Sequence, residues 1–236
     1  MRPVVLRDLF VVLSMTSGLC FPGSAGANDA FTVTGGITGT YQTTTDRRID
    51  PEFTASADLV LGYVSGHGAW RLYIEGNSTP RANGVSSLLP EANTDAGSAL
   101  DRDRQGRVQI SELNYAHRFG KALTVTAGLL DVSGFFDQSR IASDENTQFL
   151  GVSFVQNPTI EFPDYALGLV IEQSWETNTV WRAGLTSSNG LADNPNLSYA
   201  QLVNVDDDSK GVFAVTSLTW KNAAWLTRAG IWTHTA

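Results

Sequence analysis

The chain has 236 residues, of which 24 are acidic and 16 basic, so its net charge is -8 with the three histidines neutral. This acidic balance argues against nucleic acid as a partner, because phosphates attract basic surfaces. With 22 glycines, 10% aromatic residues and a mean hydropathy of -0.10, the chain is far too polar for a helical membrane protein. The composition favours many strands and turns, and we expect an all-β fold.

The first 27 residues have the pattern of a secretory signal peptide. Arg2 and Arg7 precede an apolar stretch from Leu9 to Phe21, and Ala25-Gly26-Ala27 supplies a small-residue cleavage site. The stretch is too short to cross a bilayer, which takes roughly twenty apolar residues. We therefore expect residues 1–27 to be removed and residues 28–236 to form one domain. Loss of two arginines and one aspartate changes the net charge from -8 to -9, and loss of Cys20 leaves no thiol.

Nine segments of the remaining chain alternate apolar residues with polar or small ones, as strands do when their two faces meet different surroundings. In the second segment, for example, Ala55, Leu59 and Tyr63 share one face, opposite Ser56 and Asp58. The predicted strands are residues 31–42, 53–65, 70–75, 107–119, 123–130, 165–175, 180–187, 212–220 and 225–235.

Short and long connections take turns between these strands. Turns of about three or four residues precede loops of roughly twenty to thirty residues at Asn77 to Gln105, Asp131 to Asp164 and Ser188 to Lys210. Loops of that length are uncommon in compact soluble domains. Outer-membrane barrels combine short periplasmic turns with long external loops, so this asymmetry favours an antiparallel transmembrane β-barrel.

The charged residues of the strands oppose apolar rows. A charge on the lipid face near the membrane midplane costs roughly 2 to 4 kcal/mol, so we expect these side chains to point into a wet lumen of mixed charge. Those in phase are Asp58, Arg71, Glu75, Glu172, Arg182 and Arg228, and a bulge after Ile110 would add Glu112 and Arg118. Aromatic residues near strand ends resemble a membrane girdle: Tyr63, Trp70, Trp175, Trp181, Trp220 and Trp225. The alternative is an exported β-sandwich adhesin or binding protein, whose polar face is simply solvated.

One stretch carries part of a calcium-loop pattern. Asp101, Asp103, Gln105, Gly106 and Glu112 occupy positions one, three, five, six and twelve of an EF-hand loop. Gln replaces the usual acid or Asn at position five, and the residues that follow alternate as a strand instead of repeating as a helix. The pattern favours a charged loop that enters a strand, and we expect neither a metal nor another cofactor.

The histidines give little support for an enzyme. His67 lies in a tight turn, His117 near a strand end and His234 near the end of the chain. His117 with Ser111 or Glu112 is the one pairing that could imitate a barrel hydrolase, and no complete set of nucleophile, base and orienting group follows from the spacing. We expect no catalytic residues.

The loop from Asp131 to Asp164 is unusually apolar for a segment in water. It contains Phe135, Phe136, Phe149, Phe154 and Phe162. Three arrangements remain open: the loop narrows a barrel, plugs it under the rim, or packs over its mouth without touching a solute. In the first two, its polar members would face the passage, and these are Asp137, Gln138, Arg140, Asp144 and Glu145.

Three motifs resemble the carbohydrate-selective outer-membrane porins of Gram-negative bacteria, the OprB-like family. They are Gln109-Ile110-Ser111-Glu112-Leu113-Asn114-Tyr115, then Val125-Thr126-Ala127-Gly128-Leu129-Leu130-Asp131 with Phe135-Phe136, and Asn146-Thr147-Gln148-Phe149 running to Asn157-Pro158. The resemblance covers roughly Phe53 to Gln173. It implies a barrel of about sixteen strands that passes sugars by diffusion, with inward loops and charged and aromatic side chains at a constriction.

Two features depart from that family. Nine strands is an odd number for a bacterial single-chain barrel, and the chain ends in Trp232-Thr233-His234-Thr235-Ala236 without a terminal aromatic residue. The sequence therefore predicts an incomplete barrel whose last strand lacks a partner.

From these patterns we expect residues 28–236 to be a β-barrel porin domain in the outer membrane, with sugars or other small hydrophilic solutes passing through a charged lumen. Its other partners would be outer-membrane lipid and the barrel-assembly machinery, and a homotrimer is one assembly open to it. The alternative is an envelope barrel that transports nothing, or the exported adhesin. The residues expected to line the pore are Arg71, Tyr73, Glu75, Glu112, Arg118, Phe136, Asp137, Arg140, Arg182 and Arg228.

Overall fold

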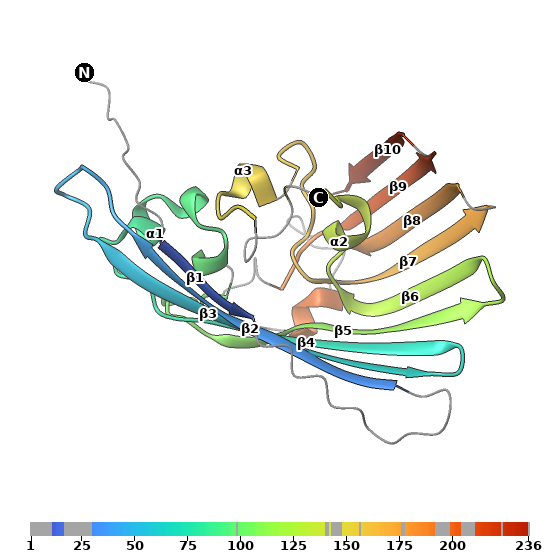
Figure 1. The fold of residues 1–236 in the computed structure, drawn as a ribbon, viewed down its shortest axis with the longest axis horizontal. Coiled ribbons are helices and arrows are strands. Elements are labelled where there is room, and N and C mark those ends of the chain that lie inside the picture. The colour runs from blue at the N-terminus through green and yellow to red at the C-terminus, as the bar shows by residue number, and fades with distance from the viewer. Residues whose placement is uncertain are drawn as a thin grey trace.

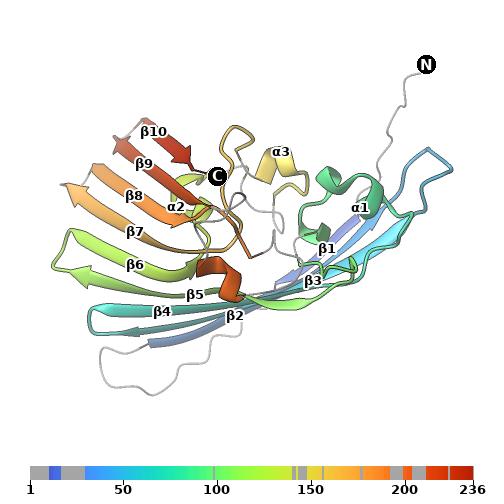
Figure 2. The same ribbon diagram turned by 180° about the vertical axis from the view of Figure 1, so that it is seen from behind.

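The computed structural model describes residues 11–16, 30–97, 99–139, 142, 148–155, 157–175, 178–191, 199–203, 211–222 and 224–235. They form one antiparallel sheet in which each strand pairs with its neighbours in sequence, in the order β1 to β10. Figures 1 and 2 show this sheet curved like a gutter, with α1, α2 and α3 on its concave side. A single sheet contradicts the sandwich alternative, which requires two sheets packed face to face.

The elements have the following bounds. The strands are β1 Val11–Thr16, β2 Ala30–Gln42, β3 Glu52–Ser65, β4 Gly68–Asn77, β5 Val108–Phe119, β6 Leu123–Leu130, β7 Ala166–Trp175, β8 Thr179–Ser187, β9 Val212–Lys221 and β10 Leu226–His234. The helices are α1 Val85–Leu88, η1 Pro90–Ala92, η2 Asp95–Gly97, α2 Ser133–Phe136, α3 Val152–Val155 and η3 Tyr199–Val203. Among the described residues, none of the helices has the length and apolar character needed to cross a membrane.

Strands β2 to β10 are the nine predicted ones, with bounds that differ from the prediction by at most two residues at either end. β1 is additional. It pairs with β2 from Val11 opposite Tyr41 to Thr16 opposite Gly36, and it lies inside the predicted signal peptide. Within the described residues β1 and β10 are the two edges of the sheet and do not pair with each other, so the sheet is open, as expected of an incomplete barrel.

Side-chain burial confirms the predicted alternation. In β3, Glu52, Thr54 and Ser56 are buried, whereas Phe53, which lies between Glu52 and Thr54 in sequence, is 67% exposed. The buried polar side chains lie on the face to which the loop before β5 and the segment after β6 are attached. This face is the concave side of the ribbon in Figure 1. Most of the exposed large apolar side chains lie on the opposite, convex face. This arrangement is the reverse of that in a water-soluble protein, where large apolar side chains are mostly buried and hydroxyl groups are mostly exposed.

A β-bulge resets the phase of β5, as predicted. Tyr73 pairs with Glu112 and the next residue of β4, Ile74, pairs with Ile110, so Ser111 is the extra residue. Because of this insertion both Ser111 and Glu112 are buried on the concave face, and Leu113 is exposed on the convex one. Without the bulge every residue after it would point to the wrong face.

The short turns lie together at one end of the sheet and the long loops at the other. Gly66 and Gly120 occupy two of the short turns with φ of 57° and 66°, a left-handed conformation that glycine adopts without strain. Large aromatic side chains stand on the exposed face beside these turns, among them Trp70, Trp175 and Trp220. Their position fits one of the two aromatic belts of a membrane barrel.

Two apolar clusters hold the loops against the sheet. The first lies on the concave face, where β6, β7 and β9 meet the segment after β6, and contains Leu130, Val132, Phe136, Val170, Phe213 and Val215. The second joins Leu129 to Leu191 and Leu202 of the loop between β8 and β9. The loops are therefore part of the folded structure and do not simply project from it.

Candidate functional site

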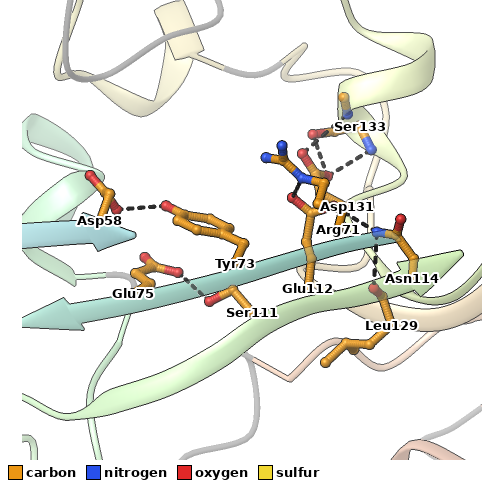
Figure 3. Close-up of polar contacts among 11 residues, drawn as sticks. Asp58, Arg71, Tyr73, Glu75, Ser111, Glu112, Asn114, Leu129, Asp131 and Ser133 are labelled. Carbon is orange, nitrogen blue, oxygen red and sulfur yellow. Dashed lines mark hydrogen bonds and ion pairs between the residues drawn. The ribbon is translucent and has the colours of Figure 1, made fainter. Parts of the chain in front are cut away.

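A charged network on β4 and β5 occupies the middle of the concave face. Arg71 Nε donates to Glu112 Oε1 over 2.9 Å, and Asn114 Nδ2 donates to Glu112 Oε2 over 3.1 Å. Figure 3 shows these side chains rising from adjacent strands toward the segment after β6. Arg71 remains 47% exposed while Glu112 is buried beneath it, so the cation is the member of the pair that meets solvent.

A second group lies further along the same strands, toward the long loops. Tyr73 donates its hydroxyl proton to Asp58 Oδ1 over 2.6 Å, and Ser111 Oγ donates to Glu75 Oε2, also over 2.6 Å. Gln109 Nε2 donates to Ser111 Oγ over 3.0 Å. The bulge that exposes Leu113 outside is what brings Ser111 to Glu75 inside (Figure 3).

The other wall of the gutter carries two arginines. Arg182 on β8 donates to Glu172 on β7 over 2.6 Å, a cross-strand pair whose residues are directly opposite. Arg228 on β10 donates from Nη1 to the carbonyl oxygen of Phe136 over 2.8 Å. Arg118 shares the phase of Glu112 near the short-turn end of β5 and is exposed. Both walls therefore present charge to the concave side.

The segment after β6 is fixed to this charged face. Asp131 accepts hydrogen bonds from the backbone of Ser133 and Gly134 at the start of α2, and its burial raises the pKa of the carboxyl group. Asp137 Oδ2 accepts from the backbone N–H of Asn157 over 2.5 Å. The described residues of the loop between β6 and β7 therefore fold onto the concave face.

Phe136 differs from its predicted role. We expected its ring to face the passage, but the side chain is only 5% exposed and packs in the first apolar cluster. Its apolar surface is better accommodated against Leu130 and Phe213 than in water. Phe136 therefore holds the segment to the wall, whereas Phe149 and Phe154 form an exposed pair with ring centroids 5.2 Å apart.

The loop between β4 and β5 is fixed by two carboxylates that the sequence did not single out. Glu52, 2% exposed, accepts hydrogen bonds from the backbone N–H of Arg81 over 2.5 Å and of Ser86 over 2.8 Å. Ser56 Oγ donates to Asp95 Oδ2 over 2.7 Å. Burial is the main cause that raises the pKa of Asp95 to about 6. The strand alternation could have placed Glu52 inside, since it shares the face of Ser56.

The structure does not gather the acids of the calcium-loop pattern. Asp101 Oδ1 accepts from the backbone N–H of Asp103 and Gln105, while both oxygens of Glu112 are engaged with Arg71 and Asn114. In the described part of the chain, no group of three or more His, Cys, Asp or Glu side chains could hold a metal ion. Asp101 thus shapes its own loop.

The pairing considered for a hydrolase does not form. His117 Nδ1 lies 3.0 Å from the hydroxyl of Tyr115 and its ring packs on Phe119, while Ser111 is bonded to Glu75 on the opposite face. Arg140, Asp144 and Glu145 lie outside the described residues. Of the predicted pore-lining residues that are described, those in the strands share one face of the sheet.

Residues 22–234, most of the chain, match the model of a protein family described as "Carbohydrate-selective porin, OprB family". The chain belongs to the OprB family. A curated protein of Aquifex aeolicus (strain VF5), described as an uncharacterized protein, is 36% identical over 102 residues. The match covers 43% of this chain and 32% of that protein, so the chain spans about a third of the length of the relative it matches. No solved structure matches the chain.

Membership of OprB confirms the resemblance drawn from the three motifs and extends it from half the chain to nearly all of it. The positions of the motif residues in the structure explain why these motifs indicate the family. Ser111 is the extra residue of the bulge between Ile110 and Glu112, and Asp131 accepts hydrogen bonds from the backbone of Ser133 and Gly134 where the chain leaves the wall. The family's sequence pattern therefore coincides with the geometry that separates the two faces.

Proposed function

We propose that this OprB protein forms an outer-membrane pore through which small hydrophilic solutes, sugars foremost, diffuse along the concave face. One observation carries the proposal: the charged strand residues stand on the loop-covered face, and large apolar residues such as Phe53, Trp70 and Ile231 are exposed on the other. Such a sheet suits lipid on one side and water on the other. Export by a cleavable signal peptide belongs to the same proposal, and catalysis does not.

The pore wall would be formed by Arg71, Tyr73, Glu75, Glu112, Arg118, Arg182 and Arg228, with Asp137 and Arg140 on the loop between β6 and β7. Positive and negative groups are both present, so the lumen does not resemble the cationic ring of an anion channel. Paired charges offer donors and acceptors to hydroxyl groups without strongly retaining an ion. This charge pattern supports a neutral, hydroxyl-rich solute over a strongly charged one.

Liposome swelling tests the proposal. The protein of the full-length gene is reconstituted into liposomes, and swelling is measured in isotonic monosaccharide, disaccharide and salt solutions. We expect swelling in monosaccharide well above that of empty liposomes and a decrease with solute size. Swelling no greater than in empty liposomes would contradict a pore and support the envelope barrel that transports nothing.

A further inference from the structure

The loop between β4 and β5, residues 78–107, is attached to the concave wall by a buried acid. Asp95, 7% exposed in η2, accepts a hydrogen bond from Ser56 Oγ, and its backbone carbonyl accepts a hydrogen bond from Asn77 Nδ2. The first contact is to β3 and the second to β4. η2 is thus the point at which this loop meets two strands of the wall at once.

The groups that face Asp95 from these strands are themselves acidic. From β3 the charged group is Asp58, which accepts from Tyr73, and from β4 it is Glu75, which accepts from Ser111. Arg107, at the entry to β5, is attracted to Glu75. An ionised Asp95 must therefore lie out of water beside two like charges, both of which disfavour the charged form.

We propose that Asp95 makes the docking of residues 78–107 on the wall depend on pH, so that acid holds the loop down and neutral pH loosens it. The effect on transport rests on the proposed function: the docked loop occupies the concave side, so acid would narrow the passage. Glu52 holds the other end of the loop through Arg81 and Ser86, so that loosening is confined to η2 and its flanks.

The direction follows from proton linkage. An exposed aspartate has a pKa of about 4, whereas docking raises the pKa of Asp95 to about 6. The docked state therefore binds the proton more tightly. Docking is strongest below about pH 4 and weakens as the pH rises through about 6, by roughly tenfold in equilibrium constant between pH 5 and 7.5.

Hydrogen exchange measures docking without any transport. For the full-length protein in detergent, we expect the protection factors of amides 92–97, corrected for intrinsic exchange, to fall by roughly tenfold between pH 5 and 7.5. Asp95→Asn should remove that change. Asp103→Asn, which deletes the same charge from an exposed position in the same loop, should keep it. Protection factors that do not change with pH in the wild type, or that fall equally in Asp95→Asn, would overturn the proposal.

A second variant keeps the test decisive if Asp95→Asn does not assemble. Ser56→Ala removes the hydrogen bond that favours ionised Asp95, so the midpoint of the change should move to higher pH. A midpoint that stays in place would contradict the role of Asp95. Single-channel conductance in planar bilayers should be lower at pH 5 than at pH 7.5; a pH-dependent loop with constant conductance would overturn the narrowing, and absence of any channel would instead count against the proposed function.

Discussion

Single residues on the concave face act mainly by satisfying buried polar groups. Glu52 is the clearest case, because its carboxylate accepts hydrogen bonds from two backbone N–H groups of a loop about thirty residues away. Glu52→Gln would place an amide group against one of those donors. We expect this to lower the free energy of unfolding by about 1.5 to 3 kcal/mol, as for a hydrogen bond to a charged group. Urea unfolding in detergent measures it, with the exposed Glu91→Gln as a control that should differ little.

Gly128 is a residue whose backbone excludes a side chain. Its φ is 134°, and a Cβ atom would lie 2.3 Å from the carbonyl oxygen of Leu113. Gly128→Ala should therefore destabilise the pairing of β5 and β6 by several kcal/mol. Gly66→Ala is the matched control, because its φ is also positive but a Cβ would meet nothing within 4 Å. It should cost about 1 to 2 kcal/mol, and equal losses in the two variants would contradict the close approach.

At the scale of elements, the bulge in β5 decides which side chains face the concave side. Deleting Ser111 would remove the extra residue and leave a regular pairing in which Gln109 and Glu112 still face the concave side. Inserting one alanine between Leu113 and Asn114 would instead turn Asn114 and the residues after it to the opposite face. We expect the Ser111 deletion to keep the heat-dependent mobility shift of folded barrels on gels and the insertion to abolish it. Loss of the shift in the Ser111 deletion, or a normal shift in the insertion variant, would contradict this account of the register.

The segment between β6 and β7 depends on a distant partner. Arg228 reaches the carbonyl oxygen of Phe136, 92 residues away, and pulls β10 and α2 together. Arg228→Ala should loosen α2, and we expect the single-channel conductance to rise, with Arg118→Ala as the control for loss of an exposed wall charge. Unchanged conductance in Arg228→Ala would mean that α2 does not limit the passage.

Strands and loops differ in how much the sequence predicts. Strand side chains alternate face by face, so the nine strands, their phase and the bulge near Ile110 follow from neighbouring residues alone. For the loops, the sequence predicted only their length and whether their residues are mainly polar or apolar. Their docking depends on contacts such as Ser56 with Asp95 and Arg228 with Phe136, which join residues 39 and 92 positions apart. No local period records such pairs, which is why Phe136 was placed in the passage and Asp95 was missed.

At the scale of the whole molecule, the two faces of the sheet require two solvents. The convex face exposes large side chains such as Ile231 at 74% and Phe53 at 67%, while hydroxyls and carboxylates are covered on the concave face. Covering that apolar surface with lipid removes the penalty of exposing it to water, at about 25 cal/mol per square ångström. We therefore propose that the concave face meets water and the convex face meets lipid.

Cysteine labelling along β4 tests this arrangement, because Cys20 is the single cysteine in these 236 residues and can be replaced. Single cysteines at Trp70, Arg71, Leu72 and Tyr73 are placed in the full-length protein in vesicles and treated with a charged, membrane-impermeant thiol reagent. We expect labelling with a period of two: Arg71→Cys and Tyr73→Cys react, and Trp70→Cys and Leu72→Cys do not. Equal labelling at all four positions, or the opposite phase, would contradict it.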